Sequence, residues 1–342
     1  MKNALHRTIL SGAIAGLLGL GVSLSAVAAD SMTLKVSHQF PGGTIDEGDF
    51  RDRLVRKFAQ EVEQRSNGEL KFEIFPASSL VKTPAQFGAL QKGSIDMTLY
   101  PLAYEGGKIP QVNITLMPGL VTSYEQGHRW KQAPIGQELE RILEDKGVKV
   151  ITWIWQAGGV AAKPKAVLVP EDIKGTKIRG GSKHMDMMFK AGAASVTNVP
   201  SSEVYSAMQT GVLDSTVTSS TSILSFRLEE VADHVTTAEQ NTFWFMFEPL
   251  LMAKSTFERL SPEQQKLVME VGASLEQFSI DESKKDDFRV AEVFEKAGKK
   301  AYRMDDAAFA QWRELAKGSS WKDFAEEVKN GQELLDMAAA VK

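Results

Sequence analysis

Arg179 is the side chain whose position in this sequence best suits it to bind a ligand. It ends a short expected strand in PEDIKGTKIRGGSKHMDMMFKAGA (170–193), just before Gly180, Gly181 and an expected helix. Ligands of open α/β sheets bind at the carboxyl ends of strands, and a guanidinium can donate two parallel charge-assisted hydrogen bonds to a carboxylate. Each such bond contributes about 1.5–3 kcal/mol. The alternative, a strand-end arginine in a surface ion pair, contributes about 0–1 kcal/mol. On the residues alone both roles stay open.

No catalytic or metal-binding constellation accompanies Arg179. The sequence contains no G-x-S-x-G, H-E-x-x-H or G-x-x-x-x-G-K-[ST] motif. The histidines lack the spacing of metal ligands, at positions 6, 38, 128, 184 and 234. GGSKH resembles an anion-binding helix start only weakly. We therefore expect no enzyme activity, no cofactor and no metal ion. A secreted hydrolase or isomerase is the remote alternative, and it would need an acid–base or nucleophilic group in the cleft.

The first half of the chain alternates between strand and helix patterns. The expected strands are TLKVSHQF (33–40), LKFEIFP (70–76) and SIDMTLY (94–100). The helix patterns between them are FRDRLVRKFAQEVEQRSNGE (50–69) and TPAQFGALQKG (83–93). This alternation predicts a parallel sheet with right-handed crossovers.

A similar alternation of strand and helix patterns occurs in the second half of the chain. ALQKGSID (89–96) and AMQTGVLD (207–214) share a helix–Gly–strand pattern, which predicts two α/β lobes of similar design. The apolar stretch 241–257 predicts a buried strand, and 261–300 predicts a long helix across both lobes, with a bend. The remaining expected elements are strands at 148–155, 176–181 and 212–218 and helices at 170–175, 182–193, 201–211, 305–317 and 320–340.

The first 29 residues predict a cleavable secretory signal peptide. Lys2 and Arg7 precede the apolar run ILSGAIAGLLGLGVSLSAVAA (9–29), which ends in small residues at a cleavage-site spacing. The alternative is an uncleaved membrane anchor. The sequence has no cysteine, which excludes disulfides and a lipid attachment site, and its net charge of −4 does not favour nucleic acid. We expect a mature periplasmic protein with no membrane insertion of its own.

Several segments together resemble the solute-binding proteins of tripartite ATP-independent periplasmic (TRAP) transporters. They are FAQEVEQRSNGELKFEIFP, ALQKGSIDM, PEDIKGTKIR, SEVYSAMQTGVLD and MAKSTFERLSPEQQ, in the family's order over almost the whole mature chain. The resemblance implies a two-lobed periplasmic binding protein fold of class α/β, with a mixed or parallel sheet flanked by helices in each lobe. It also implies hinge closure on a small organic acid, delivery to the membrane subunits of a sodium-coupled TRAP permease, no reaction and a monomeric state.

The resemblance implies that Arg179 pairs with the ligand carboxylate. This sequence departs from the family at three places. Gly159 stands about where many members have a second arginine, Thr218 about where they have asparagine, and 243–245 are aromatic. These departures predict one cationic anchor and an apolar or aromatic body in the ligand. The further candidate ligand contacts are Phe40, Tyr100, Trp155, Gln156, Thr218, Phe243 and Trp244, with Trp153 as an alternative to Trp155.

The leading hypothesis is therefore a monocarboxylate ligand. The alternative is a small dicarboxylate, hydroxy acid or sugar acid. In that case Lys163 or Lys183 of the protein would take the place of the missing second arginine. We expect lobe I to comprise residues 30–153 plus about 241–280, and lobe II to comprise 154–240 plus about 281–342.

Overall fold

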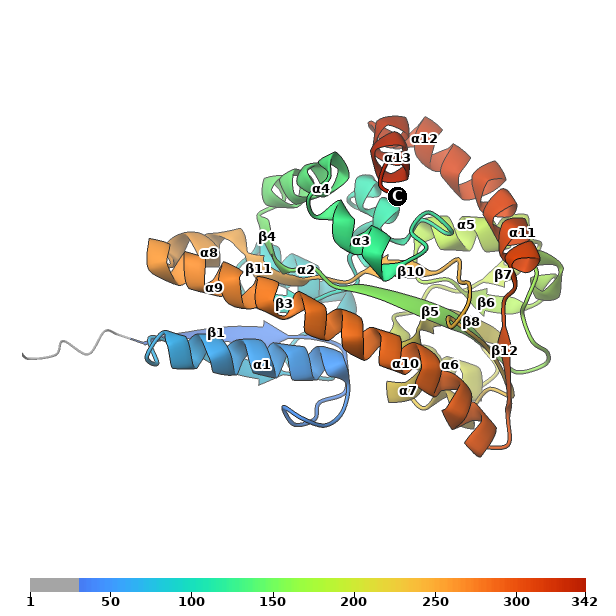
Figure 1. Ribbon diagram of the computed structural model, residues 1–342, viewed down its shortest axis with the longest axis horizontal. Helices are drawn as coiled ribbons and strands as arrows, with labels where there is room; N and C mark the ends of the chain where they lie inside the picture. Colours follow the sequence, from blue (N-terminus) through green and yellow to red (C-terminus); the bar gives the residue numbers. More distant parts are fainter. Residues whose placement is uncertain (1–30) are drawn as a thin grey trace, which may run out of the picture. The chain divides into compact units, whose positions relative to one another are not determined.

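The computed structural model describes residues 31–342, which form two β-sheets flanked by helices (Figure 1). The predicted signal peptide, residues 1–29, lies outside the described residues. Among residues 31–342 we find no helix with the length and apolar character that crossing a membrane requires. The α/β class with two sheets confirms the fold predicted from the sequence.

Within the described residues the first sheet has five strands in the order β2-β1-β3-β11-β4. Strand β1 pairs in parallel with β2 and β3, as predicted, because helices connect these strands. Strand β11 pairs antiparallel with β3 and β4. The strands are β1 (Met32–Ser37), β2 (Leu70–Phe75), β3 (Met97–Leu99), β4 (Val148–Thr152) and β11 (Leu250–Ala253), and the associated helices are α1 (Phe50–Arg65), α2 (Thr83–Gln91), α3 (Tyr124–Trp130), α4 (Pro134–Asp145) and α8 (Lys254–Arg259).

Helix α1 shows why the sequence patterns predicted the helices correctly. The Asp49 side chain accepts a hydrogen bond from the backbone N–H of Arg51 and so caps the helix. Leu54, Phe58 and Val62, which recur every four residues, are all buried. The helix therefore packs this face on the first sheet and fixes the direction of its first turn, where Arg51 lies.

Within the described residues the second sheet has seven strands, ordered β12-β9-β5-β8-β6-β7 with β10 paired to β5. Strand β6 pairs in parallel with β7 and β8, and β5 pairs antiparallel with β8, β9 and β10. The strands are β5 (Trp155–Ala162), β6 (Lys177–Arg179), β7 (Ser195–Val196), β8 (Ser215–Ser219), β9 (His234–Thr237), β10 (Phe245–Phe247) and β12 (Lys300–Arg303), and the helices in this part of the chain are α5 (Lys183–Ala191), α6 (Val204–Gln209) and α7 (Ser220–Ser225).

The central strand β5 was not expected from the sequence. Its residues WQAGGVAA are all buried, and the two glycines hide the strand pattern. A Cβ at Gly158 or Gly159 would lie 2.2 Å from the carbonyl oxygen of Thr218 or Thr236, respectively. Neighbouring backbone therefore approaches both faces of β5 so closely that only glycine fits.

Two short links join the sheets. Residues 153–154 separate β4 from β5, and 248–249 separate β10 from β11. The prediction of one strand within 241–257 is therefore wrong, because the stretch forms two strands in different sheets. Pro249 lies between them and has no N–H to donate to a ladder. The backbone N–H of Glu248 donates to the carbonyl of Ile154 at 2.9 Å, so the two links are bonded to each other.

The predicted long helix is present as α9 (Pro262–Ser274) and α10 (Glu276–Lys296), separated at Leu275. Helix α9 packs on α1 and β4, whereas α10 packs on β5, β9 and β12, so together they follow both sheets (Figure 1).

The C-terminal helices are α11 (Asp306–Ala316), α12 (Lys322–Glu327) and α13 (Gly331–Ala339). Helix α13 packs on α4 and on the 3₁₀ turn η2 (Pro110–Leu116), whereas α11 packs on α5. Residues 31–342 cluster as a single compact unit, and the predicted lobe boundaries stay a prediction.

Candidate functional site

Arg179 is buried at the end of β6, with only 1% of its surface exposed. Its Nε donates to the carbonyl of Val199 at 2.9 Å, Nη1 to the carbonyl of Val217 at 3.1 Å, and Nη2 to Oη of Tyr104 at 2.9 Å. Tyr104 lies in the 3₁₀ turn η1 (Leu102–Glu105), which follows β3 of the first sheet. These bonds hold the guanidinium in one orientation.

The guanidinium of Arg179 retains donors for a ligand. Arginine has five N–H groups, and the three bonds above leave one N–H on Nη1 and one on Nη2 without an acceptor among residues 31–342. Within the same residues no carboxylate oxygen lies within 4.0 Å of the guanidinium. A buried charge without a partner is costly. The arrangement therefore suits an anion that supplies two acceptor oxygens.

Asp186 in α5 is the acidic residue whose charge acts on Arg179, and it does not neutralise the guanidinium by direct contact. Burial raises the pKa of Asp186 to about 6, against the opposing effect of Arg179. Its Oδ1 accepts the backbone N–H of Gly180 at 3.1 Å and so fixes the loop after β6. Ser182 then caps α5 by accepting the N–H of Met185. The sequence R-G-G-S thus positions the arginine side chain.

Gly181 is needed for this geometry. It has a φ of +88°, and an added Cβ would lie 2.8 Å from Nη1 of Arg179. We expect Gly181→Ala to weaken ligand binding at least about tenfold, since the guanidinium must move from a position that a bidentate pair requires. Calorimetric titration with the ligand measures this change.

Gly175→Ala is the matched control for that substitution. Gly175 has a φ of +73°, but an added Cβ would meet nothing within 4 Å. Both substitutions carry a backbone strain of about 1–3 kcal/mol, which thermal unfolding reports, whereas only the one at Gly181 should reduce affinity. Equal affinities of the two variants would contradict the role given to Gly181.

A small cavity lies against Arg179. Its volume is about 10 Å³, which is room for about one water molecule. Its apolar wall comprises Leu116, Trp244 and Met246, and its other lining residues are Tyr104, Arg179, Gly181, Ser201, Thr218, Ser222 and Glu248. We call this space the inner cavity. Its lining supplies a cation and an apolar wall, and the space would have to widen to admit an organic acid.

Trp244 lines the inner cavity and also has an unused hydrogen-bond donor. Its Nε1 is buried and has no hydrogen-bond partner among the described residues. A Cβ at Gly158 would lie 2.5 Å from Cε3 of this indole. The tryptophan ring therefore fills the space that a side chain at 158 would need. Gly158 and not Gly159 is the position of β5 that faces Trp244, because an added Cβ at Gly159 would point to Thr236 instead.

Glu248 also lines the inner cavity and is only 1% exposed. Its Oε2 lies 3.3 Å from Nη1 of Arg51 and accepts a hydrogen bond from Nε2 of Gln156. Its Oε1 has no partner among residues 31–342. Burial raises the pKa of Glu248 to about 7, with Arg51 opposing the shift and Asp49 reinforcing it.

Arg51 connects the first sheet to α7. Its Nε and Nη2 bind the Asp49 carboxylate at 2.9 Å and 2.6 Å, and its Nη1 donates to Oγ of Ser222 at 3.0 Å. The guanidinium carbon lies 3.6 Å from the centre of the Phe40 ring. We call Asp49, Arg51 and Glu248 the buried charge cluster. It is continuous with the inner cavity through Glu248 and Ser222.

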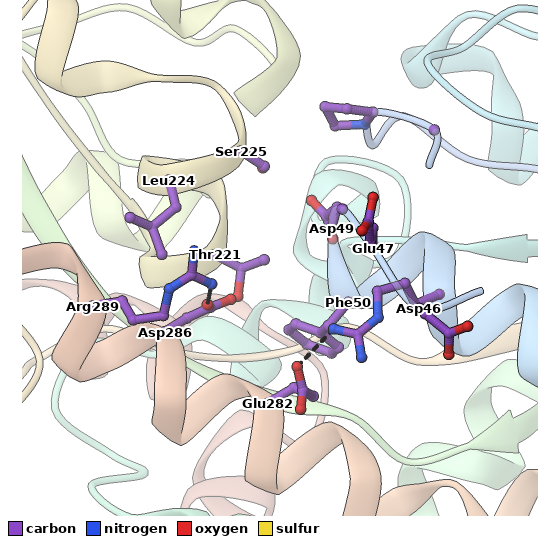
Figure 2. Close-up of a pocket in the computed structure, with 14 residues that line it drawn as sticks. Asp46, Glu47, Asp49, Phe50, Thr221, Leu224, Ser225, Glu282, Asp286 and Arg289 are labelled. Carbon is purple, nitrogen blue, oxygen red and sulfur yellow. Dashed lines mark hydrogen bonds and ion pairs between the residues drawn. The ribbon is translucent and has the colours of Figure 1, made fainter. Parts of the chain in front are cut away.

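Asp49 of this cluster also lines a larger groove (Figure 2). It has a volume of about 450 Å³, and it is lined by the residues preceding α1 and by residues of helices α1, α7 and α10. Ion pairs line its floor, with Arg53 at 2.7 Å from Glu282 and Arg289 at 3.0 Å from Asp286. Asp49 lines this groove and Glu248 lines the inner cavity, so the buried charge cluster has a member in the lining of each space.

The structure brings three of the predicted site residues together around the inner cavity, namely Arg179, Thr218 and Trp244. Gln156 is one contact away, through Glu248, and Phe40 lies under Arg51. Whether these residues bind ligand stays a prediction.

Three other predicted residues pack elsewhere. The Tyr100 hydroxyl donates to Glu105, Trp155 packs against Trp130, and Phe243 packs against Trp312. None of them is among the residues that line the inner cavity. The alternation expected of extended backbone explains Phe243, since its neighbour Trp244 takes the cavity side.

The lysines proposed as substitutes for a second arginine also lie outside the lining. Lys163 donates to the carbonyl of Met208, and Nζ of Lys183 lies 3.5 Å from Oδ2 of Asp323. Among the described residues that line the inner cavity, Arg179 is thus the only one with a cationic side chain.

Sequence reasoning missed Tyr104, Glu248, Ser201, Ser222 and Arg51. Two of them carry a signal in retrospect. Glu248 is a lone acid in the apolar run FWFMFEPLLM, and Arg51 shares the helical spacing of the buried positions Val55, Phe58 and Val62.

Two sheets, a helix pair along both and a buried arginine without a carboxylate partner among residues 31–342 suit an extracellular solute-binding protein. The chain belongs to family 7 of the bacterial extracellular solute-binding proteins, whose model matches residues 44–327. It is 52% identical over 334 residues to a solute-binding protein of Albidiferax ferrireducens, covering 98% of this chain and 99% of that protein.

A solved structure is similar throughout. It is a TRAP periplasmic solute-binding protein from Rhodoferax ferrireducens with bound malonate, at a TM-score of 0.89 and 54% sequence identity, covering 90% of this chain and 98% of that one. The C4-dicarboxylate-binding periplasmic protein of Rhodobacter capsulatus is 30% identical over 236 residues, covering 68% of this chain and 69% of that protein. These findings confirm the class predicted from the sequence, a TRAP periplasmic solute-binding protein.

Proposed function

We propose that this protein captures a small organic acid by pairing the acid's carboxylate with Arg179, and that it delivers the acid to the membrane subunits of a TRAP permease. The observation that carries the proposal is the buried guanidinium, which keeps an N–H on each Nη atom and has no carboxylate within 4.0 Å among residues 31–342. The protein acts by binding, without a reaction.

Two ligand types match the chemistry of the residues that line the inner cavity. A monocarboxylate with a compact apolar body would place its carboxylate on Arg179 and its body against Leu116, Trp244 and Met246. The single cationic side chain in the lining supports this type. A short dicarboxylate is the second type, and the malonate bound to the relative from Rhodoferax ferrireducens supports it. The small size of the cavity, about 10 Å³, favours a short body in both cases and requires the cavity to widen around it.

Closure is proposed to bury the ligand between two lobes, each built around one sheet. The links at 153–154 and 248–249 are the places where backbone rotation would move one sheet relative to the other. The hydrogen bond from Arg179 to Tyr104 and that from Arg51 to Ser222 both join elements of different sheets, so they would form as the lobes close. Function as a monomer and sodium coupling of the permease belong to the same proposal.

A thermal-shift screen tests the proposed function. A ligand present at a hundred times its dissociation constant stabilises the folded protein by about 2.7 kcal/mol. We expect malonate or a compact monocarboxylate to raise the unfolding temperature by several degrees, while uncharged analogues such as the corresponding amides leave it unchanged. Absence of stabilisation by any small acid, in a protein freed of bound ligand by refolding, would contradict the proposal.

A further inference from the structure

Glu248 faces Arg179's cavity from the link between the two sheets. It follows β10 of the second sheet and precedes β11 of the first, and its backbone N–H is bonded to the other link at Ile154. The same cavity is lined by Arg179 from the end of β6. A ligand in this space therefore has a cation on one part of the wall and a buried carboxyl group on another.

The two oxygens of Glu248 have different surroundings. Oε2 is held by Arg51 and Gln156, so the side chain cannot turn away from the cavity without breaking both contacts. Oε1 has no partner among the described residues and is buried. Buried polar atoms in native structures are nearly always paired. A ligand group in the inner cavity would supply the missing partner of Oε1.

Charge balance decides the protonation state that suits an acid ligand. The charged groups near Glu248 are Arg51 and Asp49 from the α1 region and Arg179 across the cavity; the remaining polar neighbours, Gln156 and Tyr104, are neutral. With Glu248 ionised, these two cations and two anions cancel. A bound carboxylate adds negative charge that the buried site does not balance. A proton on Glu248 removes one negative charge, which balances the charge of a monocarboxylate and halves the excess charge of a dicarboxylate.

We propose that Glu248 takes up one proton from solvent when the ligand binds, and that its Oε1–H then donates a hydrogen bond to the second carboxylate of a short dicarboxylic acid. The first carboxylate of the same acid pairs with Arg179. The inference rests on the proposed function, and it explains how a cavity with one cationic side chain holds two carboxylates.

The expected pH dependence follows from linkage. The pKa of Glu248 is already raised to about 7 without ligand, and the negative charge of the bound diacid raises it further. Below the ligand-free pKa the group is protonated in both states, so affinity does not depend on it. Above it, binding requires proton uptake, and affinity falls roughly tenfold per pH unit until the ligand-bound pKa is reached.

Calorimetric titration of the full mature protein with malonate measures the proton directly. Titrations at about pH 8 in buffers of different ionisation enthalpy give the number of protons taken up per malonate bound. Both malonate carboxylates are ionised at that pH, so the ligand itself binds no proton in solution. We expect close to one proton at this pH and a clearly smaller number at about pH 6.5, where Glu248 is already largely protonated.

Two variants test whether Glu248 is the residue that takes up the proton when malonate binds. Glu248→Gln cannot take up a proton there, so its proton uptake should be near zero and its malonate affinity should lose the decline with rising pH. Asp287→Asn is the matched control. Burial raises the pKa of Asp287 to about 7 as well, but Ser220 and Tyr124 satisfy its oxygens and it does not line the inner cavity. This control should keep the proton uptake of the wild type.

The outcomes separate this inference from the proposed function. Malonate binding by the wild type without proton uptake at about pH 8 would overturn it, and this measurement needs no variant. Undiminished uptake in Glu248→Gln, or its loss only in Asp287→Asn, would also overturn it. If the wild type does not bind malonate but binds another acid in an Arg179-dependent manner, the dicarboxylate inference fails and the proposed function stands. If no acid binds, both fail.

Discussion

Replacing Arg179 with alanine is expected to abolish measurable ligand binding. The two unused N–H groups can form two charge-assisted bonds to a carboxylate, worth about 1.5–3 kcal/mol each, so the loss corresponds to roughly a hundredfold to ten-thousandfold in dissociation constant. Arg179→Lys should lose most of this affinity too, because an ammonium group cannot make the bidentate contact. Calorimetric titration of the wild type and both variants with the best ligand of the thermal screen measures the effect.

Arg141→Ala is the control for a lost arginine charge. Arg141 is exposed on α4 and pairs with Glu138 and Asp145, so its removal should change stability little and leave affinity unchanged. The carbonyl groups of Val199 and Val217 lose their donor in Arg179→Ala, and circular dichroism must show that the variant is folded. A folded Arg179→Ala protein that binds the acid as tightly as the wild type would remove the central residue of the proposal.

The second large effect is expected from Arg51→Met. This substitution removes the cation of the buried charge cluster and leaves Asp49 and Glu248 buried without their counter-charge. Breaking one partner of a buried ion pair costs about 3–5 kcal/mol, and the bond to Ser222 on α7 is lost as well. Urea unfolding followed by tryptophan fluorescence measures the change in the free energy of unfolding.

Arg53→Met is the matched control, two residues further along the same helix. Arg53 pairs with Glu282 at 2.7 Å but is partly exposed, so its loss should cost about 1 kcal/mol or less. Adding Asp49→Asn to Arg51→Met should recover part of the stability, since it removes one uncompensated charge. Equal destabilisation by Arg51→Met and Arg53→Met would show that the cluster has no special energetic role.

The alternating strand and helix patterns predicted the fold well because they depend on local rules. The Asp49 cap, the four-residue spacing in α1 and the capped start of α9 at Ser261 are visible in the sequence and present in the structure. Strand β5 was missed because its glycines are chosen for contact with Thr218 and Thr236, which are distant in sequence. The split of 241–257 was missed because both its strands are buried and apolar.

In the candidate site too, features set by local sequence were predicted and features set by distant contacts were missed. Arg179, Thr218 and Trp244 could be placed near one another from family motifs and strand ends, and all three line the inner cavity. Tyr104, Glu248 and Arg51 could not, because each comes from a separate segment and meets the others only through the packing of two sheets. Tyr100 and Trp155 were natural candidates by residue type, but aromatic side chains more often fill a core than face a ligand.

The hydrogen bond between Tyr104 and Arg179 has a consequence for the kinetics of capture. It joins η1, which follows a strand of the first sheet, to the end of β6 in the second, while the bonds to Val199 and Val217 lie within the second sheet's part of the chain. When the proposed closure reverses, Arg179 loses only its tyrosine partner and presents a third N–H to solvent. An oriented cation in an open cleft attracts anions, and such steering weakens with ionic strength. Added salt should therefore slow association of the acid more than it speeds dissociation. The hydrogen bond from Arg179 to Tyr104 would form only after the ligand has bound.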